Sequence, residues 1–295
     1  MTEDGDHAEA AREAFALLGH EIRLDILLAL LSEWRAARTE PRSYSELMRA
    51  VGMEDSGKFN YHLQKLRGAY VRKVEDGYVP TASATALYRA VLATRPIAEP
   101  ASLDFDVDAS CPDCDGPLGA TYEQDFLTVA CRDCGSLAGH FTYPFPSNGL
   151  ADRTDEELLA AVARRAEHHV ALARSGQCPF CAGTTEVSLR REHLGDEDSH
   201  DVEITCGTCT FVVGVSLLFA LDRAPKVTTA LVALGIPVET YEKWTRPTPA
   251  VEVRSGDSTE TVLELEKAGR TATVVIDETL EVLSVAVDGE PVSPP

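Results

Sequence analysis

Eight cysteines, all of them in Cys-x-x-Cys pairs, constrain this chain more than any other feature of its sequence. Sixteen residues separate the first pair from the second, and twenty-four separate the third from the fourth. Two pairs at such a spacing can lie at the ends of a β-hairpin and bring four thiolates to one tetrahedral ion, as in zinc ribbons. The sequence therefore predicts two structural Zn²⁺ sites. Their expected ligands are Cys111, Cys114, Cys131 and Cys134 for the first site, and Cys178, Cys181, Cys206 and Cys209 for the second.

Other uses of the cysteines fit the sequence less well. The N-terminus is acidic and lacks the pattern of a signal peptide, which favours a cytoplasmic protein, where disulfides are rare. Thioredoxin-like chemistry needs one Cys-x-x-Cys pair that opens a helix, not four in a hairpin context. An interleaved combination of the pairs stays open. Four thiolates complete a coordination shell, so the nearby histidines are expected to be surface or core groups: His140, His168, His169, His193 and His200.

Charge is distributed unevenly along the 295 residues, whose formal net charge is −21. Residues 1–98 carry 13 Lys and Arg against 14 Asp and Glu, a net of −1, which leaves −20 for residues 99–295. Within residues 41–73, however, seven cations stand against three anions, and residues 56–73 contain no acid. In so acidic a chain, this local net of +4 favours contact with phosphates. The alternative is a solvated face on a helical protein-interaction domain.

Hydrophobic periodicity predicts two helices at the start of the chain. The first, around residues 11–20, would bury Ala11, Phe15 and Leu18, and the second, around residues 21–34, would bury one apolar stripe. Both helices are expected to contribute to one core.

The next segments predict a pair of short helices followed by a hairpin. One helix begins at Ser43 or Ser45 and ends before a glycine, and the other begins at Asp55 or Ser56. An Asp-Gly turn at positions 76 and 77 separates two alternating segments, and residues 82–93 form a last helix. Two helices across a Gly-containing turn, followed by a hairpin, are typical of a winged helix-turn-helix.

Four segments, in this order, resemble those of the ArsR-type winged-helix transcriptional regulators: GHEIRLDILLAL, YSELMRAVG, SGKFNYHLQKL and EDGYVPT. In that family the second helix of the pair enters the major groove, the hairpin contacts phosphates, and the first and last helices pair two subunits. The resemblance implies a homodimer that binds double-stranded DNA. Carried over by position, the residues that face DNA are Ser56, Lys58, Asn60, Tyr61, His62, Lys65, Arg72 and Lys73, while Phe59, Leu63 and Leu66 lie in the core.

This sequence departs from that family at three points, the first of which is Gly57, where the family often has serine. The cysteine pair that metal-sensing members carry on the first helix of the motif is absent from SYSELMRAV, so metal sensing by that route is not expected. Pro80 stands where a leucine is usual, which predicts that its strand lies at a sheet edge.

The remaining segments predict a mixture of helices and strands. A capping box of Thr154 and Glu157 opens a helix up to Gly176, with a buried stripe of Leu158, Val162 and Ala166. The apolar run of residues 211–221 suits a buried strand or two, residues 224–236 and 237–244 suit helices, and alternating segments after residue 250 suit an antiparallel sheet. This region resembles uncharacterised zinc-binding regions attached to winged helices in haloarchaeal regulators, and the surplus of acids with only six lysines resembles proteins of salt-loving archaea.

Together these observations predict an α+β protein with three parts: a winged helix-turn-helix at residues 1–98, two zinc-ribbon-like units at 99–222, and a helical segment with an antiparallel sheet at 223–295. We expect a cytoplasmic, homodimeric, sequence-specific transcriptional regulator with no membrane anchor. The sequence does not identify an effector. No phosphate loop, G-x-S-x-G or H-E-x-x-H motif is present, so an enzyme is not expected. The alternative function is a zinc-ribbon adaptor or transcription-machinery accessory factor whose winged helix binds protein.

Overall fold

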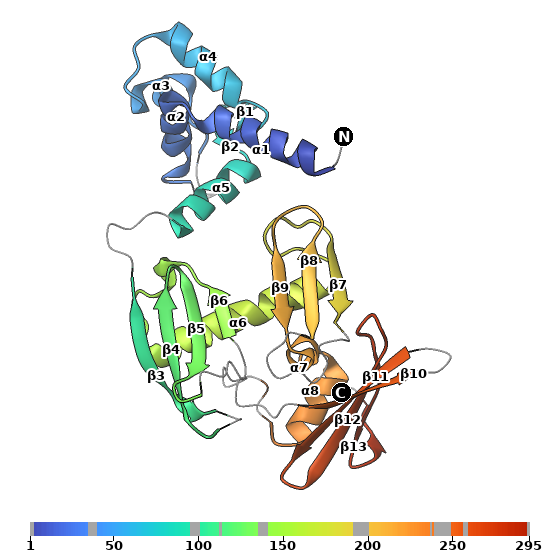
Figure 1. Cartoon of the computed structure of the whole chain (residues 1–295). Helices are drawn as coiled ribbons and strands as arrows, with labels where there is room; N and C mark the ends of the chain where they lie inside the picture. Colours follow the sequence, from blue (N-terminus) through green and yellow to red (C-terminus); the bar gives the residue numbers. More distant parts are fainter. Residues whose placement is uncertain are drawn as a thin grey trace. The chain divides into compact units, whose positions relative to one another are not determined.

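Helices form most of the first hundred residues, and antiparallel sheets interspersed with helices form the rest (Figure 1). The computed structural model describes residues 3–34, 40–94, 101–111, 114–134, 141–190, 201–236, 238, 249–255 and 259–293, with the backbone alone for residues 3–8. The chain divides into two compact units, Met1–Ile97 and Ala98–Pro295. The expected α+β class is confirmed.

The first unit combines helices with one two-stranded antiparallel sheet. Its described elements are α1 (Glu3–Leu18), α2 (Glu21–Leu31), α3 (Tyr44–Ala50), α4 (Ser56–Leu66), β1 (Val71–Val74), β2 (Gly77–Pro80) and α5 (Ala82–Ala93).

Side-chain caps fix where α3 and α4 begin. The Ser43 hydroxyl accepts a hydrogen bond from the Glu46 amide, and the Glu46 carboxylate accepts one from the Ser43 amide at 2.8 Å, which makes a capping box. Asp55 Oδ1 accepts hydrogen bonds from the amides of Gly57 and Lys58 at 2.9 and 3.0 Å. Of the alternatives left by the sequence, Ser43 and Asp55 are therefore the N-caps.

The core of the first unit holds α4 against α2 and α3. Phe59, Leu63 and Leu66 are fully buried, as the sequence predicts, and they pack with residues of α2 such as Ile26. The prediction for α1 is wrong at Phe15, whose side chain is 72% exposed. Leu18 packs against the core as predicted, together with Leu17, so the buried face of α1 is rotated only in part from the expected stripe.

The hairpin that follows α4 has a tighter turn than the sequence indicates. Val74 pairs with Gly77, so the loop consists of Glu75 and Asp76, and Gly77 already belongs to β2. Gly77 has a φ of +150°, and a Cβ placed there would collide with the Arg42 carbonyl. That approach is close because Arg42 pairs with Tyr78 through two backbone hydrogen bonds of 2.9 and 3.1 Å, which adds a third extended segment beside the hairpin.

The described residues of the second unit form three antiparallel sheets, each with its strands in sequence order. The first sheet consists of β3 (Leu103–Ser110), β4 (Pro117–Glu123), β5 (Phe126–Cys131) and β6 (Phe141–Pro144). The second consists of β7 (Thr185–Leu189), β8 (Val202–Cys206) and β9 (Val212–Val215). The third consists of β10 (Ala250–Ser255), β11 (Thr259–Lys267), β12 (Arg270–Ile276), β13 (Val282–Val287) and β14 (Glu290–Pro291). The helical elements are η2 (Ser147–Gly149), α6 (Asp155–Arg174), α7 (Leu217–Leu221) and α8 (Pro225–Ala233).

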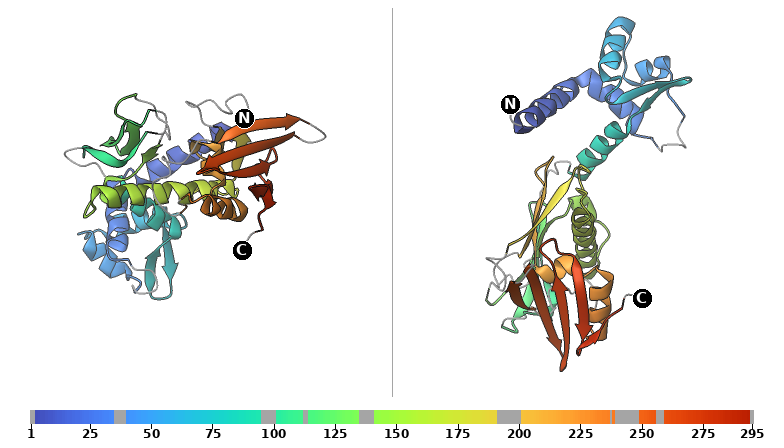
Figure 2. Two further views of the ribbon diagram at one scale, coloured as in Figure 1. Left: turned by 90° about the horizontal axis from the view of Figure 1, so that it is seen from below. Right: turned by 90° about the vertical axis from the view of Figure 1, so that its right-hand side faces the viewer.

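Helix α6 connects two hydrophobic cores of the second unit (Figure 2). Its first half buries Leu158, Val162 and Ala166 against the sheet β3–β6, which confirms the predicted stripe. Its second half buries Val170 and Ala173 in a larger core that includes β8, α7, α8 and the sheet β10–β14. The capping box of Thr154 and Glu157 is present as predicted. One continuous core therefore includes residues on both sides of position 222.

The apolar run of residues 211–221 differs from its prediction. Strand β9 occupies only Val212–Val215, and α7 follows at once, because the Ser216 hydroxyl accepts a hydrogen bond from the Phe219 amide and caps a helix there. Of the two helices expected next, α8 is confirmed, whereas residues 239–248, most of the second, lie outside the described part of the chain. None of the described helices is long and apolar enough to cross a membrane.

Candidate metal centres and nucleic-acid interface

The first cysteine cluster forms where two turns of the sheet β3–β6 meet. Cys111 and Cys114 lie in the turn between β3 and β4, and Cys131 and Cys134 lie at the end of β5. The Sγ atom of Cys114 is 3.5 Å from that of Cys131 and 3.4 Å from that of Cys134, and Cys111 Sγ is 3.9 Å from Cys134 Sγ. All four sulfur atoms lie within 4.8 Å of one another.

The second cluster repeats this arrangement on the sheet β7–β9. Cys178 and Cys181 precede β7, whereas Cys206 ends β8 and Cys209 follows it. The Sγ atoms of Cys178 and Cys209 are 3.7 Å apart, and those of Cys181 and Cys206 are 3.5 Å apart. The pairs therefore combine in sequence order, and the interleaved arrangement is not adopted.

Both clusters have the dimensions of a tetrahedral metal site. A metal–sulfur distance of about 2.3 Å places the four sulfurs of a tetrahedron about 3.8 Å apart, close to the separations observed. Backbone amides also stabilise thiolates here: amides of Thr208 and Cys209 donate to Cys206 Sγ at 3.3 and 3.4 Å. The amide of Cys209, and then that of Thr208, lowers the pKa of Cys206 to about 6. The residues present therefore fit two metal ions.

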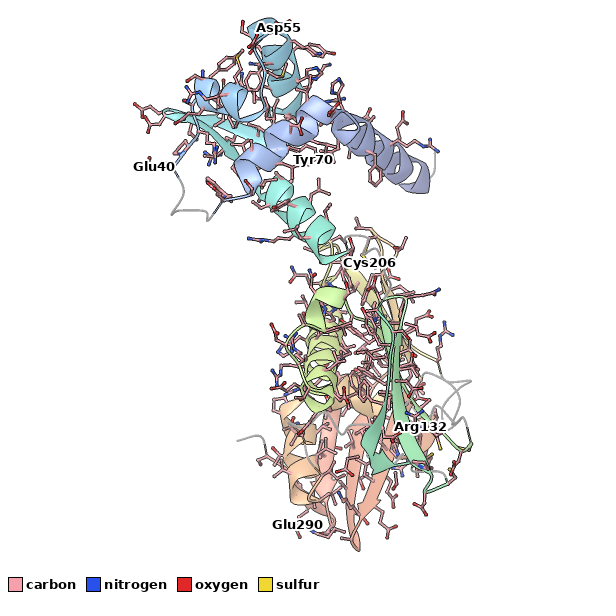
Figure 3. The ribbon with its side chains drawn as sticks, turned by 90° about the vertical axis from the view of Figure 1, so that its left-hand side faces the viewer. Glu40, Asp55, Tyr70, Arg132, Cys206 and Glu290 are labelled. Carbon is pink, nitrogen blue, oxygen red and sulfur yellow. The ribbon has the colours of Figure 1, made fainter. Side chains whose placement is uncertain are left out.

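Arg132 lies between Cys131 and Cys134 and ties their turn to β3, across the intervening strand β4. Its Nη2 donates to Asp104 Oδ1 at 2.6 Å and to the Phe105 carbonyl at 2.9 Å, and its Nε lies 2.9 Å from Asp106 Oδ1. Both carboxylates belong to β3. Figure 3 labels Arg132 and, at the other cluster, Cys206. The first metal centre is thus anchored to three strands of its sheet.

A row of rings connects the edge strand of the first sheet to the second cysteine cluster. Tyr143 of β6 forms a hydrogen bond to His169 Nδ1 on α6, and the His169 ring meets Phe180 edge to face at 5.0 Å. Phe180 lies between Cys178 and Cys181 and is also 5.5 Å from the ring of Phe211. Burial raises the pKa of Tyr143 to about 12 and lowers that of His169 to about 4, so both groups are neutral near pH 7. His168 and His169 belong to neither cysteine cluster.

The exposed side of α4 carries most of the residues expected to face DNA. Ser56, Lys58, Asn60, Tyr61 and Lys65 are all exposed, and Asp55 at the start of the helix is labelled in Figure 3. The Lys65 ammonium lies 5.7 Å from the centre of the Tyr61 ring, whose residue is 59% exposed. This surface therefore combines cations, an amide and an aromatic ring, and α4 has no acid in its first turn.

The hairpin adds two cations, whereas His62 lies apart from this surface. Arg72 and Lys73 on β1 are both exposed. His62 is only 5% exposed, and its ring lies 4.1 Å from that of His20, the N-cap residue of α2. His62 lies three residues after the buried Phe59 and four before the buried Leu66, so the helix places it on the buried side. The same spacing is present in the sequence, so the buried position of His62 could have been predicted.

Two family models match the chain, and each is described as a domain of unknown function. The model for DUF7347 matches residues 11–91, within the first unit, and that for DUF7351 matches residues 108–282, more than half of the chain and within the second unit. No curated protein and no solved structure matches the chain significantly. The second match includes both cysteine clusters and helix α6.

Proposed function

We propose that this chain, which belongs to the family described as Domain of unknown function (DUF7351), is a DNA-binding transcriptional regulator with two structural Zn²⁺ ions. In this proposal the first unit is a winged helix-turn-helix of the ArsR type. Helix α4 reads bases in the major groove, and the β1–β2 hairpin contacts the phosphate backbone.

The exposed surface of α4 and β1 carries this proposal. It presents Lys58, Lys65, Arg72 and Lys73 beside Asn60 and Tyr61, with no acid between residues 56 and 73. The cations would neutralise phosphates, and the Asn60 amide and Tyr61 hydroxyl would bond to base edges. The second unit, at a net charge of −20, repels a polyanion and is unsuited to this role. The acid-free, cation-rich segment of the sequence therefore belongs to the first unit.

Exposed apolar residues support the proposal of a homodimer. Large apolar side chains of the first unit remain exposed on three of its helices: Phe15 on α1, Leu24 and Leu28 on α2, and Val91 and Leu92 on α5. A second copy of the chain would bury them, and a two-fold dimer would place two α4 helices on successive turns of a roughly palindromic site. Analytical ultracentrifugation of the full chain and of Phe15→Asp would test this pairing, because the variant should sediment as a monomer.

The metal is proposed to be Zn²⁺ because four thiolates in tetrahedral geometry are its usual structural environment. Four protein ligands leave no open position for substrate or water. The ions would therefore stabilise the two sheets, and the proposal assigns them no catalytic role. Metal analysis of the purified chain, with two zinc ions per chain as the expected result, tests the identity.

The decisive experiment reverses charge on α4. Duplexes enriched from a random pool by the full chain should bind the wild type, whereas Lys58→Glu combined with Lys65→Glu should abolish the complex in a gel shift. A matched control, Arg164→Glu combined with Arg254→Glu, makes the same change in net charge at exposed positions in the second unit. Equal binding by the α4 variant and the control would refute the assignment, and would favour an adaptor whose first unit binds protein.

A further inference from the structure

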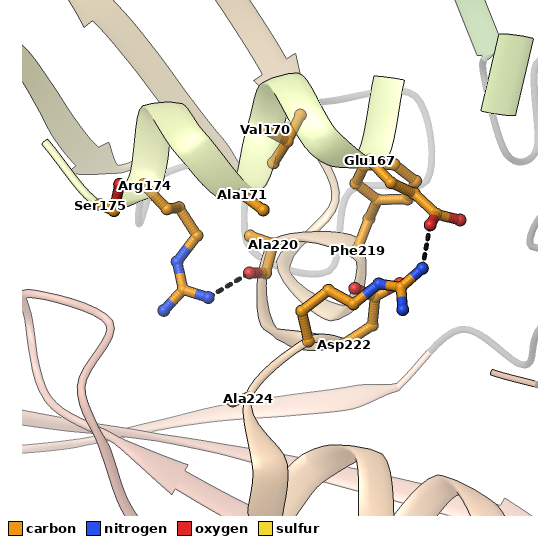
Figure 4. Close-up of a pocket in the computed structure, with 10 residues that line it drawn as sticks. Glu167, Val170, Ala171, Arg174, Ser175, Phe219, Ala220, Asp222 and Ala224 are labelled. Atoms are coloured by element: carbon orange, nitrogen blue, oxygen red, sulfur yellow. Dashed lines mark hydrogen bonds and ion pairs between the residues drawn. The ribbon is translucent and has the colours of Figure 1, made fainter. Parts of the chain in front are cut away.

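Helix α6 and the α7–α8 connection border a pocket of about 350 Å³ in the second unit (Figure 4). Glu167, Val170 and Arg174 line it from α6, and Phe219 and Asp222 line it from the facing segment. This volume lies at the lower end of the roughly 300–1,000 Å³ that small-molecule sites occupy. Its lining residues include none of the cysteines of the two clusters.

The guanidinium of Arg174 is held in place at this pocket by backbone carbonyls. Nη1 donates to the Ala220 carbonyl at 2.5 Å, as Figure 4 shows, and Nη2 donates to the Leu280 carbonyl at 3.3 Å. Burial lowers the pKa of Arg174, which shows that its charge is partly desolvated, although the charge of Asp222 opposes this effect. Among the described residues, no carboxylate oxygen lies within ion-pair distance of this guanidinium.

A partly buried cation without a direct ion pair is costly, and an anionic group in the pocket would supply the missing partner. The remaining walls restrict what that anion can be. The buried carboxylates of Glu167 and Asp222 also line this pocket. Glu167 forms an ion pair with Arg223. The negative charge of the two carboxylates disfavours a dianion such as phosphate and permits a single carboxylate. Val170, Ala171 and the Phe219 ring offer an apolar surface beside it.

We propose that this pocket binds a small monocarboxylate with an apolar, aromatic body. The carboxylate oxygens accept hydrogen bonds from Arg174, and the body of the ligand packs against Val170 and Phe219. The proposal concerns only the second unit, so it stands or falls independently of DNA binding.

The test uses the full, metal-loaded chain and four probes: benzoate, phenylacetate, the neutral isostere benzamide, and inorganic phosphate. Calorimetry and ligand-observed NMR at millimolar concentration should show binding of at least one of the two carboxylates, with benzamide and phosphate much weaker. Equal binding of benzamide and benzoate would overturn the role of Arg174, and preferred binding of phosphate would overturn the carboxylate class. No binding by either carboxylate would overturn the proposal altogether.

Variants locate the site. Arg174→Gln should weaken binding about tenfold or more, because it removes the charged donor, whereas Arg164→Gln, an exposed position on the same helix outside the pocket, should leave binding unchanged. Since Arg174 also holds two carbonyls, its replacement could reduce stability. Ala171→Leu therefore serves as a second variant: it fills the pocket at an exposed helical position and should abolish binding with the thermal unfolding midpoint preserved. Wild-type affinity in Ala171→Leu would place any bound carboxylate elsewhere and refute the site.

Discussion

The hydroxyl of Tyr143 and Nδ1 of His169 form a hydrogen bond that joins the two metal-binding sheets through helix α6. Tyr143 lies on the edge strand of the first sheet, and His169 packs against Phe180 in the Cys178–Cys181 turn of the second centre. Burial keeps the hydroxyl protonated and the imidazole neutral, so the hydroxyl can donate and Nδ1 can accept. Tyr143 and His169 therefore form a direct side-chain contact between the first sheet and the helix that packs against the second centre.

This hydrogen bond predicts a pH dependence of stability. Burial, followed by the charge of Arg165, lowers the pKa of His169 from 6.5 to about 4. Between these values the unfolded chain binds a proton that the folded chain does not, so stability falls as the pH falls from about 6.5 to about 4. After allowance for partial solvent exposure, we expect a loss of about 1–2 kcal/mol in the free energy of urea unfolding.

His169→Gln separates this effect from protonation of the cysteine ligands in the same pH range. A glutamine can still accept a hydrogen bond from Tyr143 but does not titrate. Its unfolding free energy should therefore depend less steeply on pH than that of the wild type over this interval. Parallel curves for the two proteins would show that His169 makes no contribution.

Loss of cysteines at one centre should remove one metal ion and leave the other. Cys111→Ser combined with Cys114→Ser is expected to reduce bound zinc from two ions to one per chain, as is Cys178→Ser combined with Cys181→Ser. Because structural zinc contributes about 10–16 kcal/mol of apparent binding energy in zinc-finger peptides, each loss should lower the unfolding midpoint strongly. Elemental analysis measures the stoichiometry, and two ions in either variant would contradict the two-centre arrangement.

The cysteine clusters and the helix caps could be predicted because their signals are local. Two residues between paired cysteines and a hairpin between the pairs are enough to bring Cys111 and Cys134 together. Likewise, Asp55 and Thr154 cap helices through amides only two or three residues away. Such features depend on backbone geometry near each residue rather than on the packing of distant segments.

The sequence-based predictions were wrong or incomplete where packing between distant segments determines the local structure. The apolar run of residues 211–221 carries no periodicity that distinguishes a buried strand from a buried helix, and the Ser216 cap was the signal that could have divided it. Strand β3 alternates Leu103, Phe105 and Val107 with acids, a pattern from which it could have been identified. By contrast, the contact of Tyr143 with His169 spans 26 positions and leaves no trace in either local sequence.

The N-cap of α4 should contribute to the stability of the first unit. Asp55→Ala removes the acceptor for the amides of Gly57 and Lys58 and should cost about 1 kcal/mol, whereas Asp55→Asn, which preserves a side-chain acceptor, should cost less. Chemical unfolding monitored through signals of the first unit measures the difference. If Asp55→Ala is as stable as the wild type, the cap contributes nothing.

Gly77 should tolerate no side chain. A Cβ at this position meets the carbonyl of Arg42, and the positive φ adds backbone strain, so Gly77→Ala should destabilise the first unit by about 1–3 kcal/mol. Gly52→Ala is the matched control, because Gly52 also has a positive φ but its Cβ would meet nothing within 4 Å. A larger effect at Gly77 measures the collision together with the extra strain of its φ of +150°, and equal effects would show that neither adds a cost.

Salt dependence distinguishes the cations of α4 and β1 from the groups expected to read bases. If Lys58, Lys65, Arg72 and Lys73 of both subunits each neutralise one phosphate, the slope of log K against log salt should be about −7, and Arg72→Ala should reduce its magnitude by about 2 per dimer. Asn60→Ala should instead leave the slope unchanged and relax the preference for the selected duplex over a scrambled one. Fluorescence anisotropy over a range of salt concentrations measures both quantities. A slope unaffected by Arg72→Ala would remove the hairpin from the interface, because a phosphate contact that releases no counterion is not an ionic contact.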